Sequence, residues 1–116
     1  MEKYIYRGKL ERVVDGDTID ALIDLGFDMH KSIRVRLVGI NSPESRTRDL
    51  EEKKRGLAAK ARLKEILKSN KNKIILESQG VGKYGRCLGI IRIKDTNVNQ
   101  QLVQEGHAVE YFGGKR

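Results

Sequence analysis

Two stretches in the first forty residues alternate apolar and polar side chains, and this alternation constrains the fold more than any other feature. In the first stretch, the residues of one face are apolar: Ile19, Ala21, Ile23 and Leu25. In the second, Arg34 and Arg36 lie opposite an apolar face of Ile33, Val35 and Leu37. A period of two residues is typical of half-buried strands. With the β-rich segment 4–14 and breaks at 15–16 and 26–28, the pattern predicts a three-strand meander.

The remainder of the chain predicts a helix, two more strands and a second helix. Residues 45–55 are polar and are predicted to form a loop. A helix is expected over 57–68, because four apolar residues fall on one helical stripe, namely Ala59, Leu63, Ile66 and Leu67. The two predicted strands span 73–78 and 87–93. The second helix is expected over 98–105 with Asn97 as its N-cap, followed by a short strand or extended segment at 108–112.

This order of elements predicts an α+β fold that is mainly β. Five strands, with one helix after the third and another after the fifth, fit a five-stranded OB-fold barrel. A chain of 116 residues corresponds to one domain, which we place at residues 1–112, followed by a flexible basic tail at 113–116.

The charge balance indicates a polyanionic partner. The chain has 24 Lys and Arg against 16 Asp and Glu, a net charge of +8. Nucleic acid is favoured over a membrane surface, because the basic residues are spread along the chain and do not collect on one amphipathic helix. Solubility alone is the alternative explanation. No apolar segment resembles a signal peptide or a membrane span, so a cytoplasmic location is expected, with secretion left open for a trimmed chain.

The motif Asp15-Gly16-Asp17-Thr18 has two interpretations. Asp-Gly is a common hairpin turn and needs no further role. However, the parity of the following strand places Asp17 on its apolar face, where an acid needs a compensating partner or a place at the open end of the sheet. A metal ion at the mouth of a small barrel would be such a partner.

The motif Asn41-Ser42-Pro43-Glu44 also has two interpretations. It can start a helix, with a Ser cap and Pro in the first turn. Alternatively, Pro43 holds a rigid turn that directs the Asn41 amide oxygen, the Ser42 carbonyl and the Glu44 carboxylate to one place. Oxygen ligands of this kind suit a hard cation such as calcium or magnesium.

Two arginines are candidates for binding phosphate. Arg36 lies within the second alternating stretch, and Arg86 follows Gly85 in a predicted turn. Either one alone can be a surface charge. A guanidinium group nevertheless matches phosphate oxygens bidentately and stays charged during a reaction. Tyr84 can stack on a base or a sugar, or it can simply pack in its turn.

In order along the chain, these motifs resemble the staphylococcal (micrococcal) nuclease family of thermonucleases. The ordered set covers nearly the whole chain and is far more specific than any single motif. Its segments are Asp15-Gly16-Asp17-Thr18, residues 36–44, Gly56-Leu57-Ala58-Ala59, residues 83–89 and residues 98–106. The resemblance implies an OB-fold and calcium-dependent hydrolysis of DNA and RNA that leaves 3′-phosphate ends.

The resemblance also implies roles for particular residues around a metal ion. Asp17 corresponds to a direct ligand, Ser42 offers its backbone carbonyl, and Asp15 acts through water. Asn41 stands where the family has a second metal-binding aspartate, so the site has one negative charge fewer and weakened calcium affinity is expected.

The same resemblance assigns the catalytic and substrate-binding residues. Glu44 corresponds to the residue that activates or orients the attacking water, and Arg36 and Arg86 to the pair that holds the phosphate. Lys83 and Tyr84 correspond to positions near the bound nucleotide. The rival hypothesis is a non-catalytic OB module that binds nucleic acid through a weakened metal site.

One further departure from the family concerns the end of the chain. The sequence lacks the long C-terminal helix of the family's familiar members, so part of the barrel's flank is expected to be bare. Either the fold is a minimal version, or a partner or a second copy covers this flank. Both a monomer and a weak dimer are compatible with this expectation.

Overall fold

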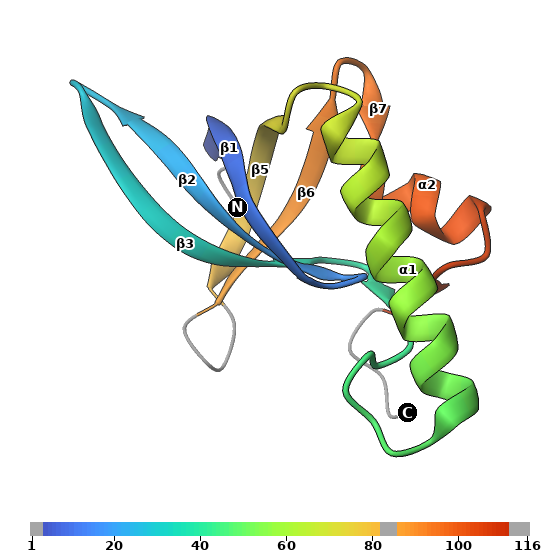
Figure 1. Cartoon of the computed structure of the whole chain (residues 1–116). Helices are drawn as coiled ribbons and strands as arrows, with labels where there is room; N and C mark the ends of the chain where they lie inside the picture. Colours follow the sequence, from blue (N-terminus) through green and yellow to red (C-terminus); the bar gives the residue numbers. More distant parts are fainter. Residues whose placement is uncertain (1–3, 82–85, 112–116) are drawn as a thin grey trace.

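Three antiparallel strands form a meander in the first part of the chain: β1 (Tyr4–Asp15), β2 (Thr18–Gly26) and β3 (Met29–Leu37). The structure is a computed structural model that describes residues 4–81 and 86–111. Two later strands, β5 (Lys73–Val81) and β6 (Cys87–Ile93), pair with each other. β1 also pairs with β5, and β3 pairs in parallel with β6, which closes five strands into a barrel (Figure 1). The predicted meander and the predicted α+β barrel are both confirmed.

The alternating residues of β2 and β3 form much of the barrel interior. Ile19, Ala21 and Ile23 are essentially inaccessible to solvent, as are Val35 and Leu37. Leu25 shares their parity, but its side chain is exposed. The reason is that the β2–β3 hairpin, near whose tip Leu25 lies, projects away from the other described elements (Figure 1).

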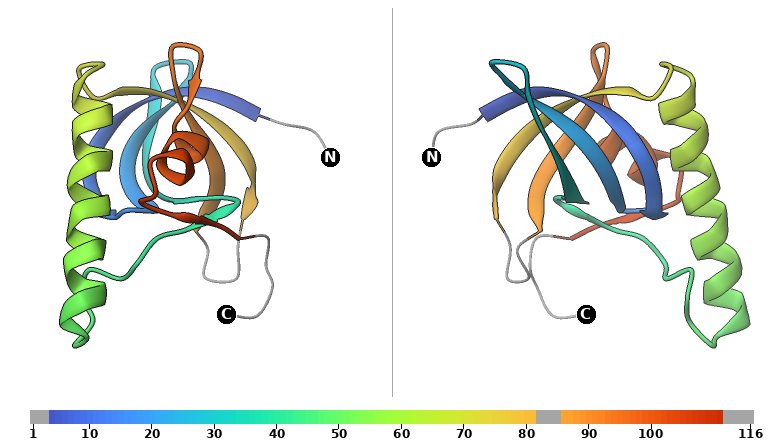
Figure 2. Two further views of the ribbon diagram at one scale, coloured as in Figure 1. Left: turned by 90° about the vertical axis from the view of Figure 1, so that its right-hand side faces the viewer. Right: turned by 60° about the vertical axis from the view of Figure 1, so that its left-hand side comes forward.

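Helix α1 (Leu50–Lys68) starts earlier than the sequence pattern predicts. The segment 45–55 is therefore not entirely a loop. Asp49 caps the helix by accepting hydrogen bonds from the backbone N–H groups of Glu51 and Glu52. The negative charges of Glu51 and Glu52 also stabilise the helix, because they lie at the positive end of its dipole. The buried face is the predicted stripe, namely Ala59, Leu63, Ile66 and Leu67. Figure 2 shows α1 alongside the barrel, where it packs against β1.

Short elements complete the fold. β4 (Ile40–Asn41) pairs with β8 (Val109–Glu110), and β7 (Thr96–Asn97) pairs with β6. The second helix, α2 (Val98–Gln104), begins at the predicted cap, since the Asn97 side chain accepts from Gln100 N–H. Phe112 in the predicted last strand, and the predicted tail at 113–116, lie outside the described residues. Within the described ranges, no helix is long and apolar enough to cross a bilayer.

Candidate active site

A cleft of about 400 Å³ opens at the end of the barrel where β1 turns into β2 and where the chain leaves β4. Every predicted site residue in the described ranges lines it: Asp15, Asp17, Arg36, Asn41, Ser42, Glu44 and Arg86. Lys83 and Tyr84 lie outside the described residues. The structure thus brings together residues that are far apart in the sequence, from Asp15 to Arg86.

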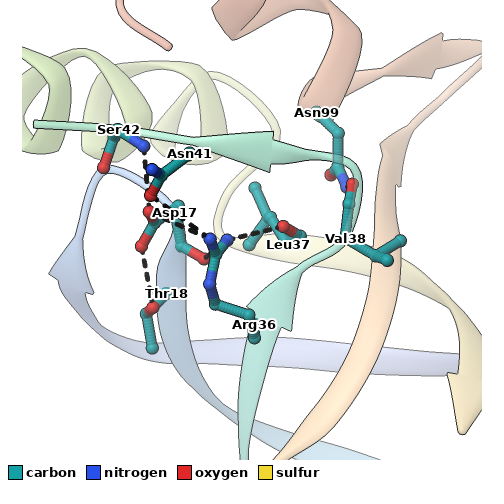
Figure 3. Close-up of polar contacts among 8 residues, drawn as sticks. All are labelled: Asp17, Thr18, Arg36, Leu37, Val38, Asn41, Ser42 and Asn99. Atoms are coloured by element: carbon teal, nitrogen blue, oxygen red, sulfur yellow. Dashed lines mark hydrogen bonds and ion pairs between the residues drawn. The ribbon is translucent and has the colours of Figure 1, made fainter. Parts of the chain in front are cut away.

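Asp17 is the most buried carboxylate in the cleft, with 8% of the residue exposed. The Thr18 hydroxyl donates to its Oδ1 at 3.0 Å, and the Ser42 backbone N–H donates to its Oδ2 at 2.9 Å (Figure 3). Arg36 Nη2 lies 3.5 Å from the same Oδ2. Strand parity predicted an acid on the apolar face that needs either partners or a place at the open end of the sheet. Its described partners are a hydroxyl, a backbone amide and a guanidinium.

Arg36 turns into the cleft from the end of β3. Its Nη1 donates to the Leu37 carbonyl at 2.8 Å, and its Nη2 lies 3.5 Å from the Asn41 amide oxygen (Figure 3). Its side chain is only 16% exposed. Arg36 is therefore fixed at the base of the cleft by groups from β3 and β4.

Arg34 is a useful comparison, because it lies on the same face of β3 and has a different environment. Its side chain is 46% exposed and forms an ion pair with Asp20 on the barrel exterior, with Nε 2.8 Å from Oδ1. The hydrogen bond from Arg34 lowers the pKa of the Asp20 carboxyl below its ordinary value. Arg34 thus links β3 to β2 through an ion pair and is not among the residues that line the cleft.

The loop after β4 carries Glu44 at the exposed rim of the cleft and is held at two points. Ser45 is buried and donates a hydrogen bond from its hydroxyl to the Asp15 carboxylate. On the other side, Gly56 of α1 touches the loop backbone so closely that an added Cβ would lie 2.4 Å from the Glu44 carbonyl oxygen. The position of Glu44 therefore depends on the end of β1 and on the surface of α1.

Asn99 lies outside the cleft but links two segments that border it, and the sequence patterns predicted no individual role for it. It is buried on α2, and its Nδ2 donates to the Val38 carbonyl at 2.9 Å and to the Gly89 carbonyl at 3.1 Å. The Ile91 N–H donates back to its Oδ1 at 3.1 Å. These bonds join the turn after β3 to β6, the strand that Arg86 precedes. The sequence feature that could have identified Asn99 is a polar residue on the buried side of a short helix.

Tyr111 is a second residue that the sequence pattern did not identify. It is one of the residues that line the cleft, and its backbone N–H donates to the Gly39 carbonyl at 2.9 Å. Thr18 also lines the cleft and has the defined role of orienting Asp17.

The oxygen atoms in the cleft suit a hard cation. Asp17 offers a carboxylate, Asn41 an amide oxygen and Ser42 a backbone carbonyl, which are ligand types that calcium accepts. The Ser42 hydroxyl is buried and has no hydrogen-bond partner among the described residues. No group of three or more His, Cys, Asp or Glu side chains suited to a metal occurs within residues 4–81 and 86–111. These oxygen ligands are therefore of types that calcium accepts, but together they carry little negative charge.

Fold and cleft together define a class: a small OB-type barrel with arginines and carboxylates at one end. Residues 34–116 match the family described as staphylococcal nuclease homologue, and the chain belongs to this family. This confirms the resemblance found in the sequence motifs.

Named relatives agree with this assignment. The chain is 33% identical over 115 residues to a micrococcal nuclease of Shigella flexneri, covering 91% of this chain and 59% of that protein. It is 34% identical over 104 residues to a thermonuclease of Staphylococcus intermedius, covering 89% and 58% of the two chains. It also matches 9% of Endonuclease YhcR of Bacillus subtilis (strain 168), at 33% identity over 92% of this chain. The chain spans less than two thirds of the length of each of these relatives.

Proposed function

We propose that this chain is a calcium-dependent endonuclease that hydrolyses phosphodiester bonds of DNA and RNA and leaves 3′-phosphate ends. One observation carries the proposal: Glu44, Arg36 and Arg86 line the same cleft as the buried Asp17. A module that only binds nucleic acid has no need of a carboxylate beside two arginines. The names of the relatives, which are nucleases and endonucleases, support the same activity.

Asp17, Asn41 and the Ser42 carbonyl would hold the calcium ion, with Asp15 acting through water. When bound, the ion polarises a phosphoryl oxygen and offsets negative charge in the transition state. Because Asn41 is neutral, this site has one carboxylate fewer than a site with aspartate there, and its affinity for calcium is correspondingly weaker.

The two arginines bind the phosphate and its transition state. Negative charge builds on the phosphoryl oxygens as water attacks, so fixed guanidinium groups stabilise the transition state more than the substrate. The contacts of Arg36 with the Leu37 carbonyl and with Asp17 hold it in place before substrate arrives. Little reorganisation is then needed during the reaction.

Glu44 accepts a proton from the attacking water. Its carboxylate is at the exposed rim of the cleft, where water has free access, and Ser45 and Gly56 fix the loop that carries it. Attack on phosphorus breaks the bond to the 5′ oxygen, which takes up a proton, and the phosphate stays on the 3′ side. Lys83 and Tyr84 would contact the nucleotide beside the cut.

The second candidate is a non-catalytic OB module that binds nucleic acid, and Asn41 is the observation that favours it. The distinguishing experiment incubates end-labelled single-stranded DNA and RNA with calcium, magnesium, manganese or EDTA. We expect fragments with 3′-phosphate ends in the presence of calcium and none in EDTA. Binding without cutting in all three metals would instead establish the binding module.

A further inference from the structure

A second hollow of about 460 Å³ lies between β1 and α1. We call it the basic groove. Its charged lining residues are Glu11, Arg12, Arg46, Lys60, Lys64 and Lys68. Five of these six are cations, and the apolar part of the lining comes from the β1 residues Leu10, Val13 and Val14. None of this lining belongs to the cleft that contains Glu44.

Most of the cations that line the basic groove have no acidic partner within residues 4–81 and 86–111. Arg12 forms an ion pair with Asp20 at 3.3 Å, and Glu11 accepts a hydrogen bond from Ser32. In the described part of the chain, no ion pair involves Arg46 or any of the three lysines. Like charges held close together repel one another, and an anionic ligand removes that repulsion.

The three lysines form a row. Lys60, Lys64 and Lys68 are spaced four residues apart on α1, so their side chains lie on one face of the helix. Eight residues of helix span about 12 Å. A row of separate cations fits an extended polyanion better than it fits a single small anion.

The basic groove begins where the active-site cleft ends. Asp15 lines the cleft and the preceding Val14 lines the groove, while Glu44 lines the cleft and Arg46 lines the groove. Ser45, which separates Glu44 from Arg46 in the sequence, donates a hydrogen bond to the carboxylate of Asp15. Figure 2 shows the loop that runs from the barrel to the start of α1, and this segment between β4 and α1 includes Glu44, Ser45 and Arg46.

We propose that the basic groove binds the phosphodiester backbone of the nucleic-acid strand whose scissile bond is in the cleft. This inference rests on the proposed nuclease function and extends it to a second contact region. Among the residues that the structure describes, those lining the groove include no aromatic side chain, so the groove would hold the backbone without stacking on bases. A membrane surface is disfavoured because the apolar face of α1 is buried in the core.

Salt-dependent binding tests this proposal. The protein with Lys60→Gln, Lys64→Gln and Lys68→Gln is compared with wild type by fluorescence anisotropy, in EDTA so that the strand stays intact. Each phosphate contact on a single strand contributes about 0.7 to the slope of log affinity against log salt concentration. For an oligonucleotide of about twenty nucleotides, we expect the slope to fall by about 2 and the affinity to fall at least about tenfold at ~0.1 M salt.

The control variant carries Lys9→Gln, Lys31→Gln and Lys94→Gln, which remove the same charge from exposed positions that line neither hollow. We expect its salt slope to stay close to that of wild type. Equal slopes for the two triple variants would overturn the proposal. It would also be overturned if only the binding of polyglutamate, and not of DNA, responded to the groove substitutions.

A parallel assay separates this inference from the nuclease proposal. Cleavage of a dinucleotide, whose single phosphodiester group occupies the cleft and leaves no phosphate for the groove, is measured with calcium for wild type and for the groove variant. Equal cleavage together with the reduced salt slope supports both proposals. If wild type does not cut, the nuclease proposal fails, and the salt slopes still decide the role of the groove.

Discussion

At the scale of single residues, Arg34 and Arg36 show how two similar positions on β3 acquire different roles. We predict that Arg36→Lys lowers the rate of DNA cleavage about 10²–10³-fold, because an ammonium group cannot maintain the forked contacts to Leu37 and Asn41 while binding phosphate. Single-turnover cleavage with saturating calcium measures the effect. Arg34→Lys is the matched control and should cut at close to the wild-type rate. An equal loss in both variants would contradict a specific role for Arg36.

Asn41 is the residue that sets the charge of the proposed metal site. Asn41→Asp adds a carboxylate beside Asp17, and we predict that calcium binds about tenfold more tightly. Isothermal titration with calcium measures this without any need for activity. Gln100→Glu adds the same charge at an exposed position on α2 and should leave the affinity unchanged. Equal or tighter calcium binding by wild type than by Asn41→Asp would exclude the assignment of Asn41 as a ligand.

At the scale of elements, the contact between α1 and the Glu44 loop controls the position of the proposed base. Glycine in a helix normally costs about 1 kcal/mol relative to alanine. Replacing a helical glycine by alanine would therefore normally raise the Tm. For Gly56→Ala we predict a lower Tm, because the new Cβ would clash with the backbone of Glu44, and slower cleavage, because the clash displaces the Glu44 loop. Thermal unfolding and cleavage rates test both parts.

The control for this prediction is Ala58→Gly, at an exposed position of the same helix. It should lower Tm through helix propensity alone and leave the cleavage rate unchanged. A Gly56→Ala variant that is more stable than wild type and equally active would show that the helix and the loop do not constrain each other.

The elements were predictable where a repeating pattern was long enough. The alternation in β2 and β3 and the apolar stripe of α1 gave the correct buried faces. The start of α1 was missed because its first turn has one apolar residue, Leu50, which is 79% exposed. There, the Asp49 cap and the acids after it determine where the helix begins, and a hydrophobic pattern does not contain that information.

The candidate site was predictable to a similar degree. Strand parity placed Asp17 on an apolar face, and the resemblance to the nuclease family grouped Asn41, Ser42 and Glu44 with it. Parity did not show that Arg36 bends into the cleft, because a long side chain can leave the face that its Cβ indicates. The bridging role of Asn99 depends on contacts between α2 and two distant strand ends, which no local pattern encodes.

At the scale of the whole molecule, an ion pair between Arg62 of α1 and Glu105 at the end of α2 joins the two helices. Arg62 Nε lies 2.5 Å from Oε1 of Glu105, and Nη2 lies 2.9 Å from Oε2. The hydrogen bonds from Arg62, followed by that from Gln101, lower the pKa of Glu105 to about 2. This value is below that of an ordinary glutamate, about 4.5.

A depressed folded-state pKa stabilises the protein above the unfolded-state value, and the effect is lost as the pH falls toward about 2. We predict that Glu105→Gln lowers Tm by a few degrees at neutral pH, and that the difference from wild type shrinks between pH 4.5 and 2. Scanning calorimetry of both proteins over this pH range measures the difference in Tm. Glu65→Gln removes a more exposed partner of Arg62 and should have a smaller effect. A Tm difference that is constant with pH would rule out the titration of Glu105 as its cause.

The central claim is that the cleft uses Glu44 to activate water for phosphodiester hydrolysis, and one measurement tests it most directly. Wild type and Glu44→Gln are compared for single-turnover cleavage of single-stranded DNA, with calcium and with EDTA, while binding of the same strand is measured in parallel. We predict cleavage by wild type only with calcium, a loss of about 10²-fold or more in Glu44→Gln, and equal binding by both proteins. Calcium-dependent cleavage that persists undiminished in Glu44→Gln would contradict the account.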